Sequence, residues 1–127
     1  MKYLILIQSN PEWRAAFAAF TAEQQAEGMA LYTSVHEELR GSGELVDAEQ
    51  LAGHETVRAV TVGAHGPVAT DAPLAETKEF LGGYYLVDVE SFDRALEIAA
   101  RFPEAAEGMV RIHPVLAADA PADTSAA

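Results

Sequence analysis

The residues that could do chemistry gather in one stretch, 70–85, which joins two strand-like runs. Asp71 opens this stretch, and Glu76 and Lys78 follow it. An aspartate can act as a general base or orient a histidine, and it can equally cap its own turn beside a proline. A lysine ammonium can hold an anionic ligand. The stretch therefore indicates acid/base chemistry or anion binding, and the alternative is a salt-bridged surface connection.

A second set of polar residues belongs to the predicted last strand, 109–115. Arg111 and His113 alternate with apolar residues, so they share the face that points away from the core. An imidazole is the default acid/base group near neutral pH, although a lone strand histidine more often packs or lies at an interface. We therefore predict Asp71 and His113 as the catalytic pair of a possible enzyme. The predicted ligand contacts are Lys78, Glu76, Arg111 and Tyr84.

Metal and cofactor sites are not predicted. The remaining histidines, His36, His54 and His65, lack the spacing of a metal site, and the chain has no cysteine for thiolate ligands, disulfides or a thiol nucleophile. Gly82 and Gly83 run into a strand and do not open a helix, so no phosphate-binding loop is formed. We expect no nucleotide cofactor.

Composition narrows the class of protein. A chain of 127 residues fits one domain, and its 20 acidic against 8 basic residues give a net charge of −12, which disfavours direct binding to nucleic acid. The acids are scattered, from Glu37 to Glu107, and this pattern predicts a solvated surface. The apolar run at 3–7 is too short to span a membrane and lacks the features of a signal peptide, so we expect a cytoplasmic protein without membrane contact.

Hydrophobic periodicity then predicts the elements that position these groups. A short helix starts at Asn10, and a longer one starts at a capping box that begins with Thr21 and ends at 41–43. On the longer helix, a stripe of residues is predicted to pack on the sheet: Met29, Tyr32, His36 and Leu39. A third helix runs from Ser91 to 102–103. The predicted strands are 3–7, 44–47, 56–62, 68–70, 83–89 and 109–115.

This order predicts an α+β fold, a ferredoxin-like split β-α-β arrangement with an inserted hairpin and helices on one face of an antiparallel sheet. The domain is expected to span 1–116, and the polar tail 117–127 to be disordered. Leu4 and Leu6 alternate with Tyr3, Ile5 and Ile7, so both faces of the first strand are apolar. We therefore expect a homodimer that packs sheet on sheet.

Residues 71–84, Asp-Ala-Pro-Leu-Ala-Glu-Thr-Lys-Glu-Phe-Leu-Gly-Gly-Tyr, resemble the signature of the DGPF branch of the YCII-related (YciI-like) family. That signature reads Asp-Gly-Pro-Phe-Ala-Glu-Thr-Lys-Glu and then Gly-Gly-aromatic, and the likeness extends from Met1 to about Leu116. It implies a dimeric α+β barrel with a cleft beside the sheet that has been proposed as an active site. The family has no settled reaction, and some relatives occur with extracytoplasmic-function sigma factors, which implies a regulatory setting for some members.

The chain departs from the signature in two places. Ala72 and Leu74 replace the family glycine and phenylalanine, and Arg111 and His113 stand where the last strand of the family has Glu and then Arg. Three functions stay open. The first is a ligand-binding or regulatory module that holds a small anionic ligand in the cleft. The second is an acid/base enzyme of isomerase, lyase or hydrolase type, and the third is a dimeric scaffold without a site.

Overall fold

The main sheet has four antiparallel strands in the order β2-β5-β1-β6, which is the order of a ferredoxin-like split β-α-β fold. The computed structural model describes residues 1–72 and 78–119. Its strands are β1 (Lys2–Ser9), β2 (Leu45–Gln50), β5 (Phe80–Asp88) and β6 (Val110–Pro114). This arrangement confirms the predicted α+β fold with a four-stranded antiparallel sheet.

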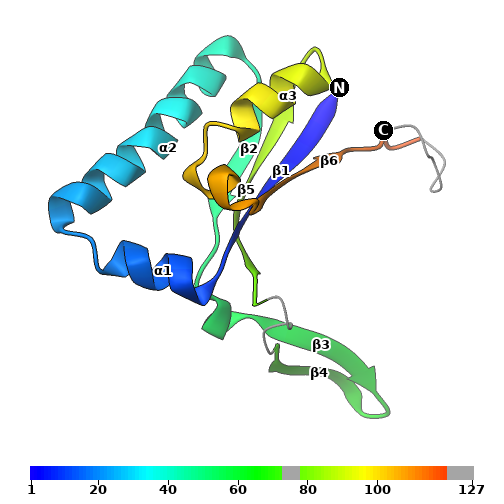
Figure 1. Ribbon diagram of the computed structural model, residues 1–127. Coiled ribbons are helices and arrows are strands. Elements are labelled where there is room, and N and C mark those ends of the chain that lie inside the picture. Colours follow the sequence, from blue (N-terminus) through cyan, green and yellow to red (C-terminus); the bar gives the residue numbers. More distant parts are fainter. Residues whose placement is uncertain (73–77, 120–127) are drawn as a thin grey trace.

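Three α-helices and two short 3-10 helices complete the body (Figure 1). They are α1 (Pro11–Ala18), α2 (Ala22–Ser42), α3 (Phe92–Ala99), η1 (His54–Thr56) and η2 (Pro103–Glu107). The predicted helix starts are confirmed. The Asn10 side chain accepts from the Trp13 N–H, Thr21 and Gln24 form a reciprocal capping box, and Ser91 accepts from the Arg94 N–H.

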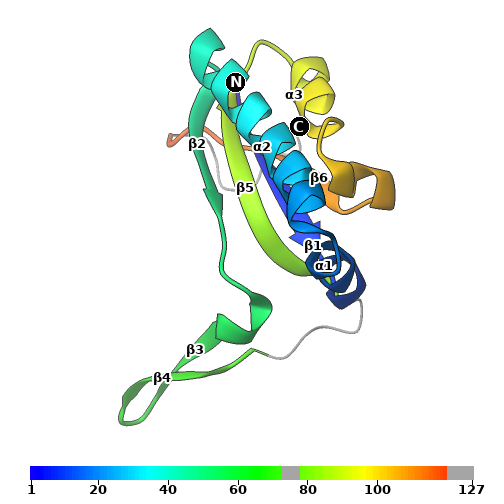
Figure 2. The same ribbon diagram turned by 90° about the vertical axis from the view of Figure 1, so that its left-hand side faces the viewer.

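The core lies between one face of the sheet and helices α2 and α3, which cover the same face (Figures 1 and 2). Alternate residues of β1 and β5 point into it, and Val35 and Leu39 meet them from α2. Ile98 and Phe102 close the core from the side of α3 and η2. Among the described residues, no helix lies over the opposite face of the sheet, and Leu4, Leu6 and Leu86 are half-buried there.

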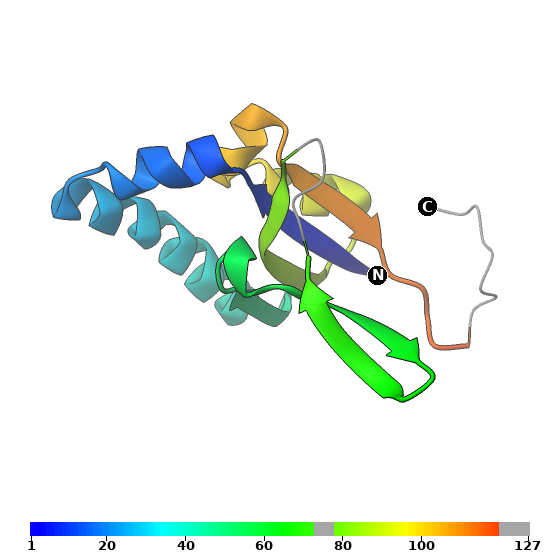
Figure 3. The same ribbon diagram turned by 90° about the horizontal axis from the view of Figure 1, so that it is seen from below.

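The inserted hairpin consists of β3 (Arg58–Gly63) and β4 (Gly66–Asp71) and projects away from the body of the fold (Figures 1 and 3). Every residue of β3 is exposed, including Val60 and Val62. The hairpin predicted from the turn residues is confirmed.

Two expectations about individual side chains are wrong. Met29 is 43% exposed and is not part of the core, because α2 faces the core with the side that carries Leu31, Val35 and Leu39. Glu104, expected to be a solvated acid, is 7% exposed, because η2 turns it inward beside Phe102.

Of the predicted disordered tail, residues 120–127 lie outside the described residues. Among the described residues, no helix is both long and apolar enough to cross a membrane.

Candidate functional site

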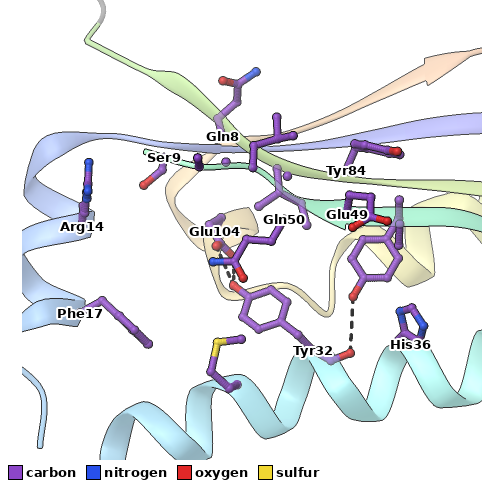
Figure 4. Close-up of a pocket in the computed structure, with 18 of the residues that line it drawn as sticks. Gln8, Ser9, Arg14, Phe17, Tyr32, His36, Glu49, Gln50, Tyr84 and Glu104 are labelled. Carbon is purple, nitrogen blue, oxygen red and sulfur yellow. Dashed lines mark hydrogen bonds between the residues drawn. The ribbon is translucent and has the colours of Figure 1, made fainter. Parts of the chain in front are cut away.

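A cavity of about 620 Å³ lies between α1, α2 and the sheet, on the helix-covered side next to β2 and β5 (Figure 4). Aromatic rings from α1, α2 and β5 line it: Trp13, Phe17, Tyr32, Phe80 and Tyr85. The two helices approach closely at one end, where a Cβ added to Gly28 would lie 3.4 Å from the Phe17 ring. An aromatic cavity of this volume suits a small ligand.

At the floor of the cavity, a tyrosine meets a buried carboxylate. The Tyr32 hydroxyl lies 2.5 Å and 2.6 Å from the two carboxylate oxygens of Glu104 (Figure 4). Burial and the neighbouring carboxylate both raise the pKa of Tyr32, because ionisation would place two negative charges together in a site of low polarity. Tyr32 is therefore a fixed hydrogen-bond donor at neutral pH.

Along α2, the cavity is lined by Tyr32, His36 and Arg40, which follow one another at four-residue intervals and so lie on one stripe of the helix. The Arg40 Nη2 lies 2.9 Å from the His36 Nε2. Since a guanidinium can only donate, Nε2 accepts this hydrogen bond and the proton of neutral His36 is on Nδ1. The stripe thus runs from a phenol to a guanidinium.

An ion pair joins α1 to η1 beside the cavity. Two Arg14 nitrogens bind the Glu55 carboxylate at 2.7 Å and 2.9 Å. The Arg14 guanidinium lowers the pKa of Glu55 to about 2. Arg14 lines the cavity but already has an acidic partner, whereas none of the ion pairs formed by the described residues includes Arg40.

The structure places two of the predicted residues at the two ends of the signature stretch. Asp71 ends the hairpin, is 92% exposed at its side chain, and pairs with Arg58 across the strands at 3.6 Å. Lys78 is exposed just before β5 and adopts a left-handed backbone with φ of 56°. Glu76 lies outside the described residues.

The other predicted residues belong to the open face of the sheet. His113 is exposed on β6 and lies opposite Leu4, while Arg111 lies opposite Leu6 and pairs with Glu79 at 3.8 Å. The Tyr84 hydroxyl donates to Asp47 at 2.6 Å, and this carboxylate raises the pKa of Tyr84. Tyr84 is also one of the residues that line the cavity, whereas Asp71 and His113 are not. The structure gives Asp71 an arginine as its ionic partner, so the predicted Asp71–His113 pair stays a prediction.

Sequence reasoning missed the pairing of Tyr32 with Glu104 and the cavity position of Arg40. The four-residue spacing of Tyr32, His36 and Arg40 was a usable signal, because it marks one helix stripe that mixes aromatic and cationic groups. In residues 1–72 and 78–119, no three His, Asp or Glu side chains converge to hold a metal ion.

Comparison with known proteins shows similarity to one protein family, to a protein sequence and to a solved structure. The YCII-related domain matches residues 1–119. An uncharacterized protein of Rhizobium meliloti (strain 1021) is 28% identical over 99 residues, which are 78% of this chain and 77% of that protein. The fold is similar to that of the 5-chloro-2-hydroxyhydroquinone dehydrochlorinase of Burkholderia phenoliruptrix AC1100, solved in complex with 2,5-dihydroxybenzoquinone. That likeness has a TM-score of 0.50 at 14% identity and covers 91% of this chain and 94% of the enzyme.

Proposed function

Because the chain belongs to the YCII-related domain family, we propose that it is a ligand-binding module that holds a small anionic aromatic ligand in the cavity between α1, α2 and the sheet. The observation that carries the proposal is the cavity of about 620 Å³, lined by aromatic rings and by the Arg40–His36 pair. Rings of Trp13, Phe17 and Tyr85 offer flat apolar surfaces to a planar ligand. Arg40 supplies the positive charge.

The charges of the cavity limit the ligand to one acidic group. Glu37 and Glu104 line the same cavity as Arg40, so a polyanion such as a nucleotide would meet more repulsion than attraction. A mono-anionic ring would place its charge at Arg40 and its ring among the aromatic side chains. The dehydrochlorinase of similar fold was solved with a planar dihydroxyquinone, which is a ligand of this size and shape.

The alternative is an acid/base enzyme that uses Asp71 with His113, and Lys78 or Arg111 to hold an anion. Glu79 already pairs with Arg111, and Arg58 with Asp71. These groups lie on the hairpin and on the open face of the sheet, so they would act on a ligand outside the cavity. The ligand-binding proposal is preferred because aromatic rings and Arg40 line one cavity together, whereas Asp71 and His113 do not line it.

We also propose that the protein forms a homodimer through the open face of the sheet. Leu4, Leu6 and Leu86 are apolar residues on this face, and no helix covers them. A regulatory partner such as a sigma-factor system stays an expectation from the family resemblance.

Two acidic aromatic probes test this proposal: benzoate and 2,5-dihydroxybenzoquinone. Their binding is measured by ligand-observed NMR and by calorimetry. We expect Arg40→Gln to weaken binding about tenfold, because a charge-assisted hydrogen bond is lost. Lys78→Gln and Arg111→Gln remove the same charge outside the cavity and should leave the affinity unchanged. Loss of binding in those two variants, with Arg40→Gln unaffected, would move the ligand to the signature stretch and refute the cavity as the site.

A further inference from the structure

We propose that Glu104 and Tyr32 form a recognition site for a hydrogen-bond donor, so that the ligand of the cavity is an aromatic acid with a hydroxyl group opposite its acidic group. This inference rests on the proposed function, because it assigns the ligand class of the same cavity. It starts from the hydrogen bonds that Glu104 makes and from those that it lacks.

The Glu104 carboxylate can accept more hydrogen bonds than the described protein groups around it donate. Both of its oxygens lie within 2.6 Å of the Tyr32 hydroxyl, but a phenol carries one proton and can donate to one of them at a time. None of the ion pairs between described residues includes Glu104. A carboxylate that is 7% exposed and takes one donor from the described residues is costly to bury. A donor from a ligand would remove that cost.

Aromatic packing holds the tyrosine that binds the Glu104 carboxylate. Tyr32 stacks on Phe102 with ring centroids 5.7 Å apart and planes at 15°, and Tyr85 packs on the same Phe102 ring at 4.9 Å. Phe102 is 1% exposed and comes directly before η2, which carries Glu104. The donor site is therefore preorganised by the packing of three aromatic rings.

The distance to the cationic end of the stripe sets the shape of the ligand. His36 is one helical step of four residues from Tyr32, and Arg40 is two, so they lie about 6 Å and 12 Å along the axis of α2. Glu104 and the Arg40–His36 pair line the same cavity, so a ligand that contacts both carries its donor and its acidic group on different substituents, which we place at opposite ends of one ring. The acidic group would lie at Arg40 and the hydroxyl group at Glu104.

Calorimetry on the full chain with three probes tests this assignment: 4-hydroxybenzoate, 4-methoxybenzoate and benzoate. The methoxy group keeps the oxygen atom but cannot donate and is larger by a methyl group, and benzoate, which has neither substituent, controls for that added size. We expect 4-hydroxybenzoate to bind about tenfold or more tightly than 4-methoxybenzoate, since a site built around a donor rejects ligands that lack one. Equal affinity for these two probes overturns the inference and leaves the proposed function standing.

Variants identify the residue responsible. Glu104→Gln should reduce the preference for the hydroxyl probe to less than about threefold, because its amide offers a donor where the carboxylate offered an acceptor. Glu107→Gln, on the same short helix but exposed, should keep the full preference. A preference that survives Glu104→Gln in a folded protein, checked by circular dichroism, overturns the inference.

Failure of the proposed ligand-binding function would give a different result. If benzoate, 4-hydroxybenzoate and 2,5-dihydroxybenzoquinone all fail to bind the wild-type protein, the cavity is not a site for aromatic acids, and both proposals are refuted. If Glu104→Gln does not fold, the comparison of the hydroxyl and methoxy probes on the wild-type protein still decides the inference.

Discussion

At the scale of single residues, the ionic contact that best joins two elements is the fork between Arg94 and Glu44. Two guanidinium nitrogens of Arg94, on α3, lie 2.9 Å from the two carboxylate oxygens of Glu44, which directly precedes β2. Both side chains are largely shielded from water, with 25% and 19% exposure. Glu97 also pairs with Arg94, at 3.5 Å, but from an exposed position. Glu44 and Glu97 therefore allow a shielded and an exposed ion pair of the same arginine to be compared.

We expect Glu44→Gln to lower the free energy of unfolding by about 1–2 kcal/mol, because a shielded, charge-assisted fork is lost. Glu97→Gln should change it by less than about 0.5 kcal/mol, as for an exposed pair. Urea denaturation at neutral pH measures both. Equal effects of the two variants would show that the geometry of the fork contributes nothing.

The same fork makes a pH-dependent contribution to stability. Arg94 lowers the pKa of Glu44 below its usual value of 4.5, so the folded protein binds this proton less tightly than the unfolded chain does. The contribution is complete above pH 4.5 and is lost as the pH falls through the lower pKa of the folded state. Glu44→Gln should therefore flatten this part of the curve of stability against pH.

At the scale of elements, the glycine pair of the signature has a structural reason. Gly83 pairs with Gln50 of β2, and a Cβ added to Gly83 would lie 2.9 Å from the carbonyl oxygen of Glu49. That atom belongs to the backbone of a paired strand and cannot move without disturbing the β2–β5 ladder. Gly83 thus permits the close approach of β2 at the edge of the cavity.

We expect Gly83→Ala to lower the melting temperature, at a cost of about 1–3 kcal/mol, which is typical of overpacking at a rigid site. Gly41→Ala is the control. Gly41 lies in the last turn of α2 with no atom within 4 Å of an added Cβ, so alanine should stabilise the helix by about 0.5–1 kcal/mol. Thermal unfolding of the two variants checks the opposite signs, and a neutral Gly83→Ala would contradict the close-approach explanation.

The elements could be predicted from the sequence because their signals are local. The caps at Asn10, Thr21 and Ser91 each act within a few residues, and they mark the helix starts that the structure confirms. The stripe on α2 was harder to interpret, because Tyr32 and His36 have the spacing of core residues. In the structure, Leu39 is buried in the core, whereas Tyr32 packs against the core and also lines the cavity.

The candidate site depends on contacts between distant parts of the chain. Tyr32 and Glu104 are 72 positions apart, and they meet only because β1 pairs with both β5 and β6. In the sequence, Glu104 is one of many scattered acids, and nothing next to it distinguishes a buried carboxylate from a solvated one. Pairing of this kind requires the tertiary fold.

At the scale of the whole molecule, the open face of the sheet has opposite charges at its two edges. Strand registers place Glu49, Tyr84, Leu6 and Arg111 in one row, and Asp47, Leu86, Leu4 and His113 in the next. The β2 edge is therefore acidic, the β6 edge is basic, and the centre is apolar. A two-fold axis parallel to the strands would lay the acidic edge of one subunit over the basic edge of its partner, whereas an axis across the strands would lay acid over acid.

This pattern predicts that Leu6→Lys abolishes the proposed homodimer, because it places a charge at the apolar centre of the face. Sedimentation equilibrium should give two 13.6 kDa chains for the wild-type protein and one for the variant. Leu96→Lys adds the same charge on α3, in the helical layer on the other side of the sheet, and should stay dimeric. Raising the salt concentration should weaken the wild-type dimer by screening the paired edges. A wild-type protein that sediments as a single chain would refute the dimer. If the Leu6→Lys variant is still a dimer, the interface lies on another face. The exposed valines of the hairpin are then the next residues to substitute.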